Sequence, residues 1–385
     1  MRILYGVVGE GMGHATRSKV VCEYLESRGH SVKIVVSGRA HAYLAKSFSD
    51  VVEIRGLTIR YVENAMDRDG TLARNVLAAP SMLMDNVAAY YARVVDFEPE
   101  LVVTDFDSFA HLFAKRHGLP VISIDNQQII ARCKHHDDIK RGVKVDYQLT
   151  KAFVKAKLPR CDHTIITTFF QPPVRKKFAD TTTLVPPILR KSILAAKERA
   201  KVGDHVLVYQ TSLSNSDLLP ALNRITKEKF VVYGLRRNDV VGNCVVKDFD
   251  EVGFVHDLAT AKAVVTNGGL SLLGESVYLG KPVYSVPVEH QFEQVMNARY
   301  LEELGYGLAT TRIDPDILNL FLREVPKYAA RVAKHSQRGN ELLFRTLDDL
   351  VHHHAKKAKK RRKERERERE RDGKDGEREA FVPTS

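Results

Sequence analysis

The chain has 385 residues, 44% of them hydrophobic, and a formal net charge of +12 at pH 7. That length suits two domains rather than one core, and the hydrophobic fraction excludes a largely disordered chain. No run of about 18 apolar residues occurs, so the sequence predicts no membrane-spanning helix. We expect a reduced, cytoplasmic setting because the cysteines show neither metal nor disulfide spacing: Cys22, Cys133, Cys161 and Cys244.

In the first half of the chain, short apolar runs alternate with segments of helical period. This alternation is typical of a parallel sheet with crossover helices, and we assign residues 1–180 to one Rossmann-like, doubly wound domain. Residues 181–190 contain TTTLVPP and are predicted to be a linker. The expected strands are 3–8, 31–36, 101–104, 121–124 and 163–167, with helices after Gly13 and over about 78–95.

The same alternation restarts after the linker and predicts a second Rossmann-like domain over residues 191–325. A helix is expected over 326–354. Ligands of such sheets bind beyond the carboxyl ends of the strands, so the α/β fold predicted here has two domains facing a shared cleft. The expected strands are 205–209, 230–233, 263–266 and 282–286, and the helices between them are 217–227, 249–261, 270–279 and 291–304.

Residues 355–385 form a charged tail in which 13 Lys/Arg and 8 Asp/Glu lie between positions 356 and 379. The tail has no apolar face, so we expect it to be solvated and disordered, or helical in its Glu/Arg stretch. It could also anchor the chain to an anionic membrane or bind nucleic acid. The interspersed glutamates weaken both alternatives, and nucleic acid is not an expected partner.

The first Gly-rich segment, Gly9 to His14, reads GEGMGH and lies between the first strand and the first helix. Glycines there bring backbone amides to the helix start, which favours anions. The spacing lacks the third glycine of a dinucleotide fingerprint, and no acidic residue ends the second expected strand. A nicotinamide or flavin cofactor is therefore not expected.

His14 would lie in the first helical turn at the cleft, where a neutral imidazole can act as a general base. The alternative is a histidine that only hydrogen-bonds nearby backbone. Asp105 and Asp107 follow the strand 101–104, on the same carboxyl edge. We assign the cap of the next helix to Asp107 and a His–Asp dyad to His14 and Asp105.

The second Gly-rich segment is Asn267-Gly268-Gly269, which ends a strand and is followed at once by a helix. Exposed amides at that helix start suit a diphosphate. Glu275 falls about two turns further on, where its carboxylate can accept both hydroxyls of a ribose.

These segments resemble the GT-B glycosyltransferases, and within them the lipid-linked N-acetylglucosaminyl transferases of peptidoglycan synthesis and their archaeal and bacterial relatives. The resemblance covers roughly residues 1–350. Its elements are the G-x-G-x-G-H segment, the Gly-Gly turn with Glu275 six residues later, Gly280-Lys281-Pro282, Pro287 and Asn297-Ala298.

The resemblance implies a nucleotide-sugar donor, UDP-linked. Backbone amides would hold its diphosphate, Glu275 its ribose, and backbone groups of Phe254 and Val255 its base. The loop of Gly9, Glu10, Gly11, Met12 and Gly13 would face acceptor and diphosphate. The implied donor-binding set is Gln210, Thr211 and Ser212 at phosphate, Phe254, Val255, Asn267, Gly268, Gly269, Leu270, Ser271 and Glu275, with Glu289, Gln291 and Gln294 at the sugar.

The placement of His14 and Asp105 also resembles the His–Asp pair of the plant natural-product glycosyltransferases. The implied reaction is hexosyl transfer with inversion, without metal or other cofactor, in which His14 deprotonates an acceptor hydroxyl. The expected acceptor is lipid-linked or a polysaccharide, in cell envelope or glycolipid synthesis. The amphipathic segment 145–158 is either a core-facing helix or a patch for peripheral contact with the inner membrane face.

Two other functions fit the same residues. A nucleotide-sugar epimerase shares the fold and the Gly-Gly…Glu signature, and would convert the sugar without an acceptor. A non-catalytic protein that only binds sugar nucleotides would keep the donor site but would not use His14.

Overall fold

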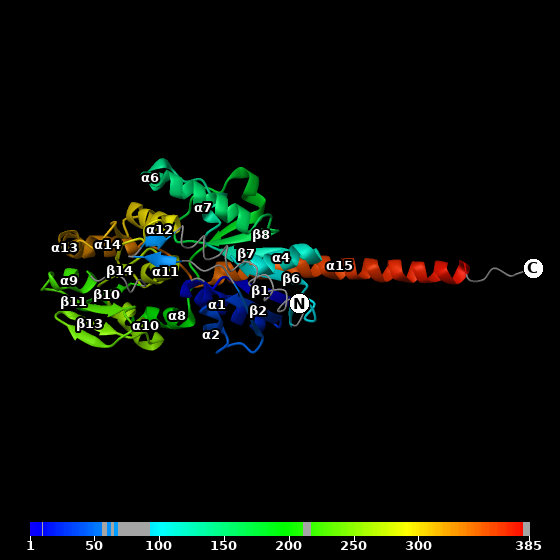
Figure 1. Ribbon diagram of the computed structural model, residues 1–385, viewed down its shortest axis with the longest axis horizontal. Coiled ribbons are helices and arrows are strands. Elements are labelled where there is room, and N and C mark those ends of the chain that lie inside the picture. The colour runs from blue at the N-terminus through cyan, green and yellow to red at the C-terminus, as the bar shows by residue number, and fades with distance from the viewer. Residues whose placement is uncertain (10, 56–59, 63–64, 68–92, 211–216, 380–385) are drawn as a thin grey trace, which may run out of the picture.

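The computed structural model describes residues 1–9, 11–55, 60–62, 65–67, 93–210 and 217–379. It contains two seven-stranded sheets, one in each half of the chain, with helices packed on both (Figure 1). The central strands are buried along nearly their whole length, as parallel strands covered on both faces must be. The prediction of an α/β protein with two doubly wound domains is confirmed.

The first sheet is parallel throughout and has the order β3-β2-β1-β6-β7-β8-β9. Two short strands, Arg60–Val62 (β4) and Ala65–Asp67 (β5), pair separately. The sheet strands are Arg2–Val7 (β1), Ser31–Ser37 (β2), Val51–Ile54 (β3), Leu101–Asp105 (β6), Val121–Asp125 (β7), His163–Thr167 (β8) and Thr182–Val185 (β9). The helices are Met12–Ser27 (α1), Ala40–Leu44 (α2), Ser108–His117 (α4), Ile129–Arg132 (α5), Asp137–Lys140 (α6) and Lys144–Lys157 (α7).

The second sheet has the order β12-β13-β11-β10-β14-β15-β16, and only its edge strand β12 is antiparallel. Its strands are His205–Tyr209 (β10), Lys229–Tyr233 (β11), Asp239–Val241 (β12), Cys244–Lys247 (β13), Ala263–Thr266 (β14), Val283–Ser285 (β15) and Gly307–Ala309 (β16). The helices are Lys191–Ala196 (α8), Leu218–Asn223 (α9), Glu251–Thr260 (α10), Leu270–Tyr278 (α11), Phe292–Glu303 (α12), Pro315–Arg323 (α13) and Val325–Val332 (α14).

Each sheet has a point where the chain reverses its direction of travel across the strands. In the first sheet the chain runs outward from β1 to β3 and then continues on the other side at β6. In the second sheet the same reversal lies between β10 and β14. Crevices for ligands form at the carboxyl ends of strands flanking such a reversal. We therefore expect a ligand-binding site at the loops that follow β1, β6, β10 and β14.

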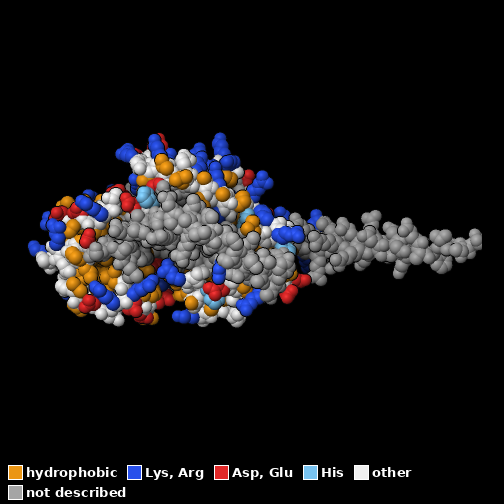
Figure 2. All heavy atoms as spheres, viewed as in Figure 1, with side chains coloured by type: hydrophobic (Ala, Val, Ile, Leu, Met, Phe, Trp, Pro, Cys, Tyr) orange, Lys and Arg blue, Asp and Glu red, His pale blue; other side chains and the backbone are white. Residues whose placement is uncertain are grey.

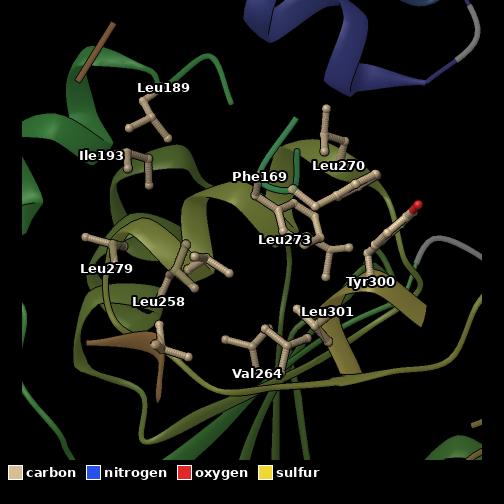
Figure 3. Packing of buried hydrophobic residues seen from close by; sticks show 14 of the residues in the cluster. Phe169, Leu189, Ile193, Leu258, Val264, Leu270, Leu273, Leu279, Tyr300 and Leu301 are labelled. Atoms are coloured by element: carbon tan, nitrogen blue, oxygen red, sulfur yellow. The ribbon is translucent and has the colours of Figure 1, made fainter. Parts of the chain in front are cut away.

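An apolar cluster joins the two domains along one side. Ile129, Tyr147 and Phe170 of the first domain share it with Leu270 and Tyr300 of the second. The rings of Phe170 and Tyr300 stack with centroids 3.9 Å apart. Figure 3 shows the second-domain part of this cluster, with Phe169 of the first domain reaching into it. This packing holds the two sheets against each other on that side.

Two predicted boundaries differ from the structure. Thr182–Val185, which we placed in the linker, forms the edge strand β9, because β-branched residues suit a sheet whatever prolines follow them. The helix predicted over 326–354 is two helices: α14 ends at Val332, and α15 spans Glu341–Glu379. Gly339, with φ of +52°, lies in the turn between them.

Helix α15 returns to the first domain and buries Leu343, Leu347 and Val351 in that domain's core. The ring of Phe344 stacks on Tyr24 of α1, with centroids 3.9 Å apart. Further on, the charged stretch continues as helix and projects away from both domains (Figure 1). In the described parts of the chain, neither α15 nor any other helix is long and apolar enough to cross a bilayer.

The cap of α4 is the one predicted for Asp107: its Oδ1 accepts the amide of Ala110 at 2.8 Å. Burial raises the pKa of Asp107 to about 6 even though the helix amides lower it. Between about pH 3.8 and pH 6, the Asp107 carboxyl is therefore mostly protonated in the folded protein and mostly ionised in the unfolded chain.

Asp107→Asn keeps a capping oxygen and removes the buried charge. We expect its free energy of unfolding at pH 8 to exceed that of the wild type by up to about 3 kcal/mol. Because the folded pKa is the higher one, the difference should grow from pH 4 to pH 6 and vanish below pH 4. Urea unfolding at pH 4, 6 and 8 measures it. Asp250→Asn, at the exposed cap of α10, is the control and should change stability by less than about 0.5 kcal/mol. Equal or lower stability of Asp107→Asn at pH 8 would contradict the prediction.

Candidate active site

His14 and Asp105 come together at the reversal point of the first sheet. His14 lies in the first turn of α1, just after β1, and Asp105 is the last residue of β6, which pairs with β1. The Nδ1 atom of His14 lies 2.8 Å from Oδ1 of Asp105. The Asp105 side chain is fully buried and that of His14 is 14% exposed, so the imidazole is partly accessible to solvent.

Arg17, which sequence reasoning missed, binds the same carboxylate. Its Nε donates to Oδ2 of Asp105 at 2.7 Å and its Nη2 donates to Oδ1 at 2.6 Å. Ser18 Oγ adds a third bond to Oδ2, at 3.1 Å. An isolated buried carboxylate would cost several kcal/mol, and a bidentate guanidinium offsets that penalty. The sequence feature that could have identified Arg17 is its position three residues after His14, which places both on the same face of α1.

Asp105 is a carboxylate at neutral pH. Burial raises the pKa of Asp105, but the neighbouring Arg17 and His14 outweigh burial. The resulting pKa is about 2, below the usual value of 3.8. Its charge is therefore available to hold the imidazole of His14 in one orientation and to stabilise a proton taken up by that ring.

The contacts of His14 Nδ1 define its tautomer. Nδ1 lies 2.6 Å from Arg17 Nη2 as well as 2.8 Å from Asp105 Oδ1, and these two partners are themselves 2.6 Å apart. In this nearly equilateral triangle, the two N–H bonds of Nη2, about 120° apart in a planar guanidinium, cannot point at both Oδ1 and Nδ1. The consistent arrangement has Nδ1–H and Nη2–H both donating to Oδ1. In the neutral form of this ring, Nε2 carries the lone pair.

The rest of the predicted loop surrounds this pair. The amide of Gly9 donates to Ser37 Oγ at 2.9 Å, and Gly11, with φ of +91°, is the N-cap of α1. Met12 is 38% exposed, and Gly13 lies next to Ser271 of the second domain. Glu10 lies outside the described residues.

The second Gly-rich segment has the expected strand–turn–helix form. Gly268 has φ of +142°, and a Cβ there would lie 2.8 Å from the carbonyl oxygen of Gln294. Asn297 fixes the turn by donating to the Gly268 carbonyl at 3.0 Å, and Asn267 donates to that of Val286 at 3.1 Å. Only glycine fits this close approach in that backbone conformation.

The starts of α1 and α11 lie next to each other where the two domains meet. A Cβ on Gly13 would lie 2.8 Å from Oγ of Ser271, so the two Gly-rich segments are in direct contact range. Neither helix has a side-chain cap, since their N-caps are Gly11 and Gly269, and neither has an acidic residue in its first turn. Two uncapped helix starts leave backbone amides and positive dipole ends free for an anion.

Gln210 lies at the carboxyl end of β10, beside this point. Its side chain is fully buried, and neither its amide oxygen nor its nitrogen bonds any described residue. Leaving such groups unpaired costs about 1–3 kcal/mol each, so they mark a position for a ligand's polar groups. Thr211 and Ser212, predicted alongside it, lie outside the described residues.

Glu275 is buried in the second turn of α11 and already has a partner. Arg190, at the crossing between the domains, donates Nε and Nη2 to its two carboxylate oxygens, each at 2.8 Å. Arg190 also reaches Glu251 at 3.3 Å. Sequence reasoning missed Arg190. A carboxylate oxygen has two lone pairs, so Glu275 can still accept hydroxyl groups while held by the guanidinium.

Phe254 and Val255, which were predicted to hold the base through backbone groups, have their backbone groups inside a helix. Both residues lie within α10, where the amide of Phe254 bonds the Asp250 carbonyl at 2.8 Å, and both side chains are buried. Their backbone groups belong to the helix ladder. In the loop before α10, Phe249 is 54% exposed and its ring lies against that of Phe254.

The three residues predicted at the sugar lie around the start of α12. Glu289 is exposed, while the amide of Gln294 accepts from Val288 N at 2.9 Å and donates to Gln291. Glu293, which sequence reasoning did not select, contacts the first domain and accepts bonds from two residues that follow β7, Asn126 and Gln127. It is one of the acidic groups that the second domain presents to the first, beside Glu303, which meets His136 at 2.9 Å.

Comparisons with known proteins agree with this arrangement. Residues 1–326 match Glycosyl transferase family 1. An uncharacterized glycosyltransferase of Methanosarcina acetivorans is 25% identical over 352 residues, covering 84% of this chain and 90% of that protein.

Two solved structures share the fold. UGT2 of Phytolacca americana, complexed with UDP-2fluoro-glucose and pterostilbene, has a TM-score of 0.61 at 15% identity, over 92% of this chain and 99% of its own. The glycosyltransferase VinC, in complex with DTDP, has a TM-score of 0.61 at 17% identity, over 92% and 100%. On the match over residues 1–326, together with two facing doubly wound sheets, the chain belongs to Glycosyl transferase family 1, with the GT-B fold.

Proposed function

We propose that this glycosyltransferase moves a hexosyl group from a UDP-linked sugar to an acceptor hydroxyl, with inversion and without a metal ion. The observation that carries the proposal is the position of the His14–Asp105 pair opposite the uncapped start of α11. A general base and an anion-binding helix start on opposite walls of one cleft suit displacement of a nucleoside diphosphate.

In the proposed step, the acceptor oxygen forms a bond to the anomeric carbon while its proton passes to Nε2 of His14. The bond from that carbon to the diphosphate oxygen breaks, and its electron pair leaves with the nucleoside diphosphate. A single displacement inverts the anomeric carbon. Asp105 holds the imidazolium through Nδ1–H, and the amides of Leu270 and Ser271 receive the charge that develops on the diphosphate. These amides replace the neutralising role that a metal ion has in other sites.

Donor binding is proposed for the remaining second-domain residues. The unpaired amide of Gln210 would meet phosphate, Glu275 the ribose, and Glu289, Gln291 and Gln294 the sugar hydroxyls. The structural neighbours solved with UDP-2fluoro-glucose and with DTDP support a nucleotide sugar as the donor class.

For the acceptor, we propose a lipid-linked molecule, as in the lipid-linked N-acetylglucosaminyl transferases, reached by peripheral contact with the inner membrane face. Segment 145–158 forms most of α7, which has a buried side and an exposed side. Tyr147 and Val154 are buried, while Val145, Leu149 and Phe153 point outward and are 69%, 54% and 48% exposed. Figure 2 shows hydrophobic groups among Lys and Arg side chains over α6 and α7.

This outward apolar row, which we call the α7 strip (Val145, Leu149 and Phe153), is flanked by exposed Lys144 and Lys155. Apolar side chains beside lysines suit the boundary between headgroups and acyl chains of an anionic membrane. The ring of Phe153 lies 6.1 Å from that of Phe106, the residue after Asp105. A lipid-linked acceptor at the strip would therefore be delivered close to the His14–Asp105 pair.

The catalytic and donor roles separate in two variants. His14→Gln removes the base and should lower kcat by about 10²–10⁴-fold while leaving the donor Kd unchanged. Glu275→Gln removes a charged acceptor of the ribose and should raise the donor Kd by about 10–100-fold. Transfer assays in EDTA and calorimetric titration with UDP-sugars measure both effects, with exposed His256→Gln as the control.

Each rival function has its own result in the same assays. Release of an epimerised nucleotide sugar in the absence of acceptor would identify an epimerase. Donor binding with no turnover, and no effect of His14→Gln on function, would identify a binding protein. Loss of transfer in EDTA would contradict the metal-free proposal.

Membrane contact is tested by sedimentation with vesicles. The wild type should bind vesicles containing phosphatidylglycerol more than vesicles of phosphatidylcholine alone. Leu149→Glu should lower the partition coefficient by about tenfold or more, because a buried leucine contributes about 1.5–3 kcal/mol. Val252→Glu on α10, where the valine is 78% exposed, should not lower it. If deletion of residues 356–385 abolishes binding while Leu149→Glu leaves it unchanged, the tail and not the α7 strip makes the contact.

A further inference from the structure

We propose that Arg17 is a positioning residue that links the catalytic base to the donor domain. On one side, Arg17 orients the Asp105 carboxylate that binds His14. On the other side, Arg17 binds Asn126, which in turn binds Glu293 of the second domain. The proposal rests on the function proposed above for His14, and it adds a residue and a dependence on domain closure that the His–Asp pair alone does not contain.

The first step is that Arg17 determines where the Asp105 carboxylate points. Arg17 is 6% exposed and binds both oxygens of Asp105 in the paired geometry that only a guanidinium provides. A lysine would offer a point charge to one oxygen and would leave the carboxylate free to rotate. Because Oδ1 also receives Nδ1–H of His14, rotation of the carboxylate would move the imidazole with it.

The second step is that Arg17 donates one more hydrogen bond, on the side that faces the second domain. Its Nη1 donates to Oδ1 of Asn126 at 3.3 Å. Asn126 directly follows β7, the strand next to β6, so this bond spans two neighbouring strand ends of the first sheet. The side chain of Arg17 is thus held at both ends of its guanidinium.

The third step is that the amide of Asn126 is fixed from the other domain. Its Nδ2 donates to Oε1 of Glu293, and Gln127 donates to Oε2 of the same carboxylate. An amide that must give a hydrogen to Glu293 presents its oxygen to Arg17; turned over, it would present a donor to a guanidinium that also only donates. Glu293 therefore selects the one amide orientation that Arg17 can bind.

The consequence is a continuous series of hydrogen bonds from Glu293 through Asn126, Arg17 and Asp105 to His14. Glu293 lies in the first turn of α12, and the other four residues belong to the first domain. Separation of the domains would remove Glu293 and free the amide. The base is then correctly aligned only when the donor domain is closed over the acceptor domain.

The test combines a double-mutant cycle with a spectroscopic measurement. Arg17→Lys should lower kcat about 100-fold, since a base displaced by about 1 Å loses that much, and should change the donor Kd less than twofold. Glu293→Ala should lower kcat about tenfold in the wild-type background and have no further effect in Arg17→Lys. Guanidinium ion should restore part of the activity of Arg17→Ala. The controls are Arg28→Lys at the C-cap of α1 and Glu302→Ala on α12, both exposed.

The spectroscopic measurement does not depend on transfer. In ¹⁵N-histidine-labelled protein, His14, assigned by its loss in His14→Gln, should show a protonated, hydrogen-bonded Nδ1. That signal should shift in Arg17→Lys and in Glu293→Ala and remain in both controls. An unchanged His14 signal in Arg17→Lys, or multiplicative effects of the two substitutions on kcat, would overturn the proposal. A wild type that shows the signal and its shifts but transfers no sugar would instead overturn the proposed function.

Discussion

Asp105 carries a negative charge where water does not reach it, at the end of a central strand of the first sheet. Three donors from one turn of α1 meet this carboxylate: Arg17, Ser18 and His14. A buried charge is tolerated only when such bonds surround it, so the position of α1 on the sheet and the position of the base are set by one interaction. The imidazole is oriented by an ion pair that the fold needs for its own stability.

The second domain contains a parallel arrangement. Glu275 is buried on α11 and held in the same bidentate way by Arg190, which lies at the crossing from the first domain. Each domain thus places one carboxylate, neutralised by an arginine, near the reversal point of its sheet. The apolar cluster that includes Phe170 and Tyr300 keeps these two points facing each other. The cleft is consequently a product of domain packing as much as of either sheet.

Much of this could be predicted from sequence because the evidence is local. β-branched runs that are apolar on both faces indicate a covered parallel sheet, and glycines after a strand indicate a helix start without a side-chain cap. His14 and Asp105 are 91 residues apart, yet each follows a strand, and strand ends share one edge. Phe254 and Val255 were assigned to the base through the resemblance alone, although the helix predicted over 249–261 already contained both residues, as α10 does.

By itself, then, the sequence determined the two sheets and the two Gly-rich turns, because strand propensity and glycine conformation act over short distances. It also determined the His–Asp pair, because both residues follow strands whose carboxyl ends lie along one edge. Only the tertiary structure decided which polar side chains bind each other. Arg190 meets Glu275 across 85 residues, and Asn126 meets Glu293 across 167. Those partners depend on side-chain direction and on how the domains close, and neither is encoded in any segment of the chain taken alone.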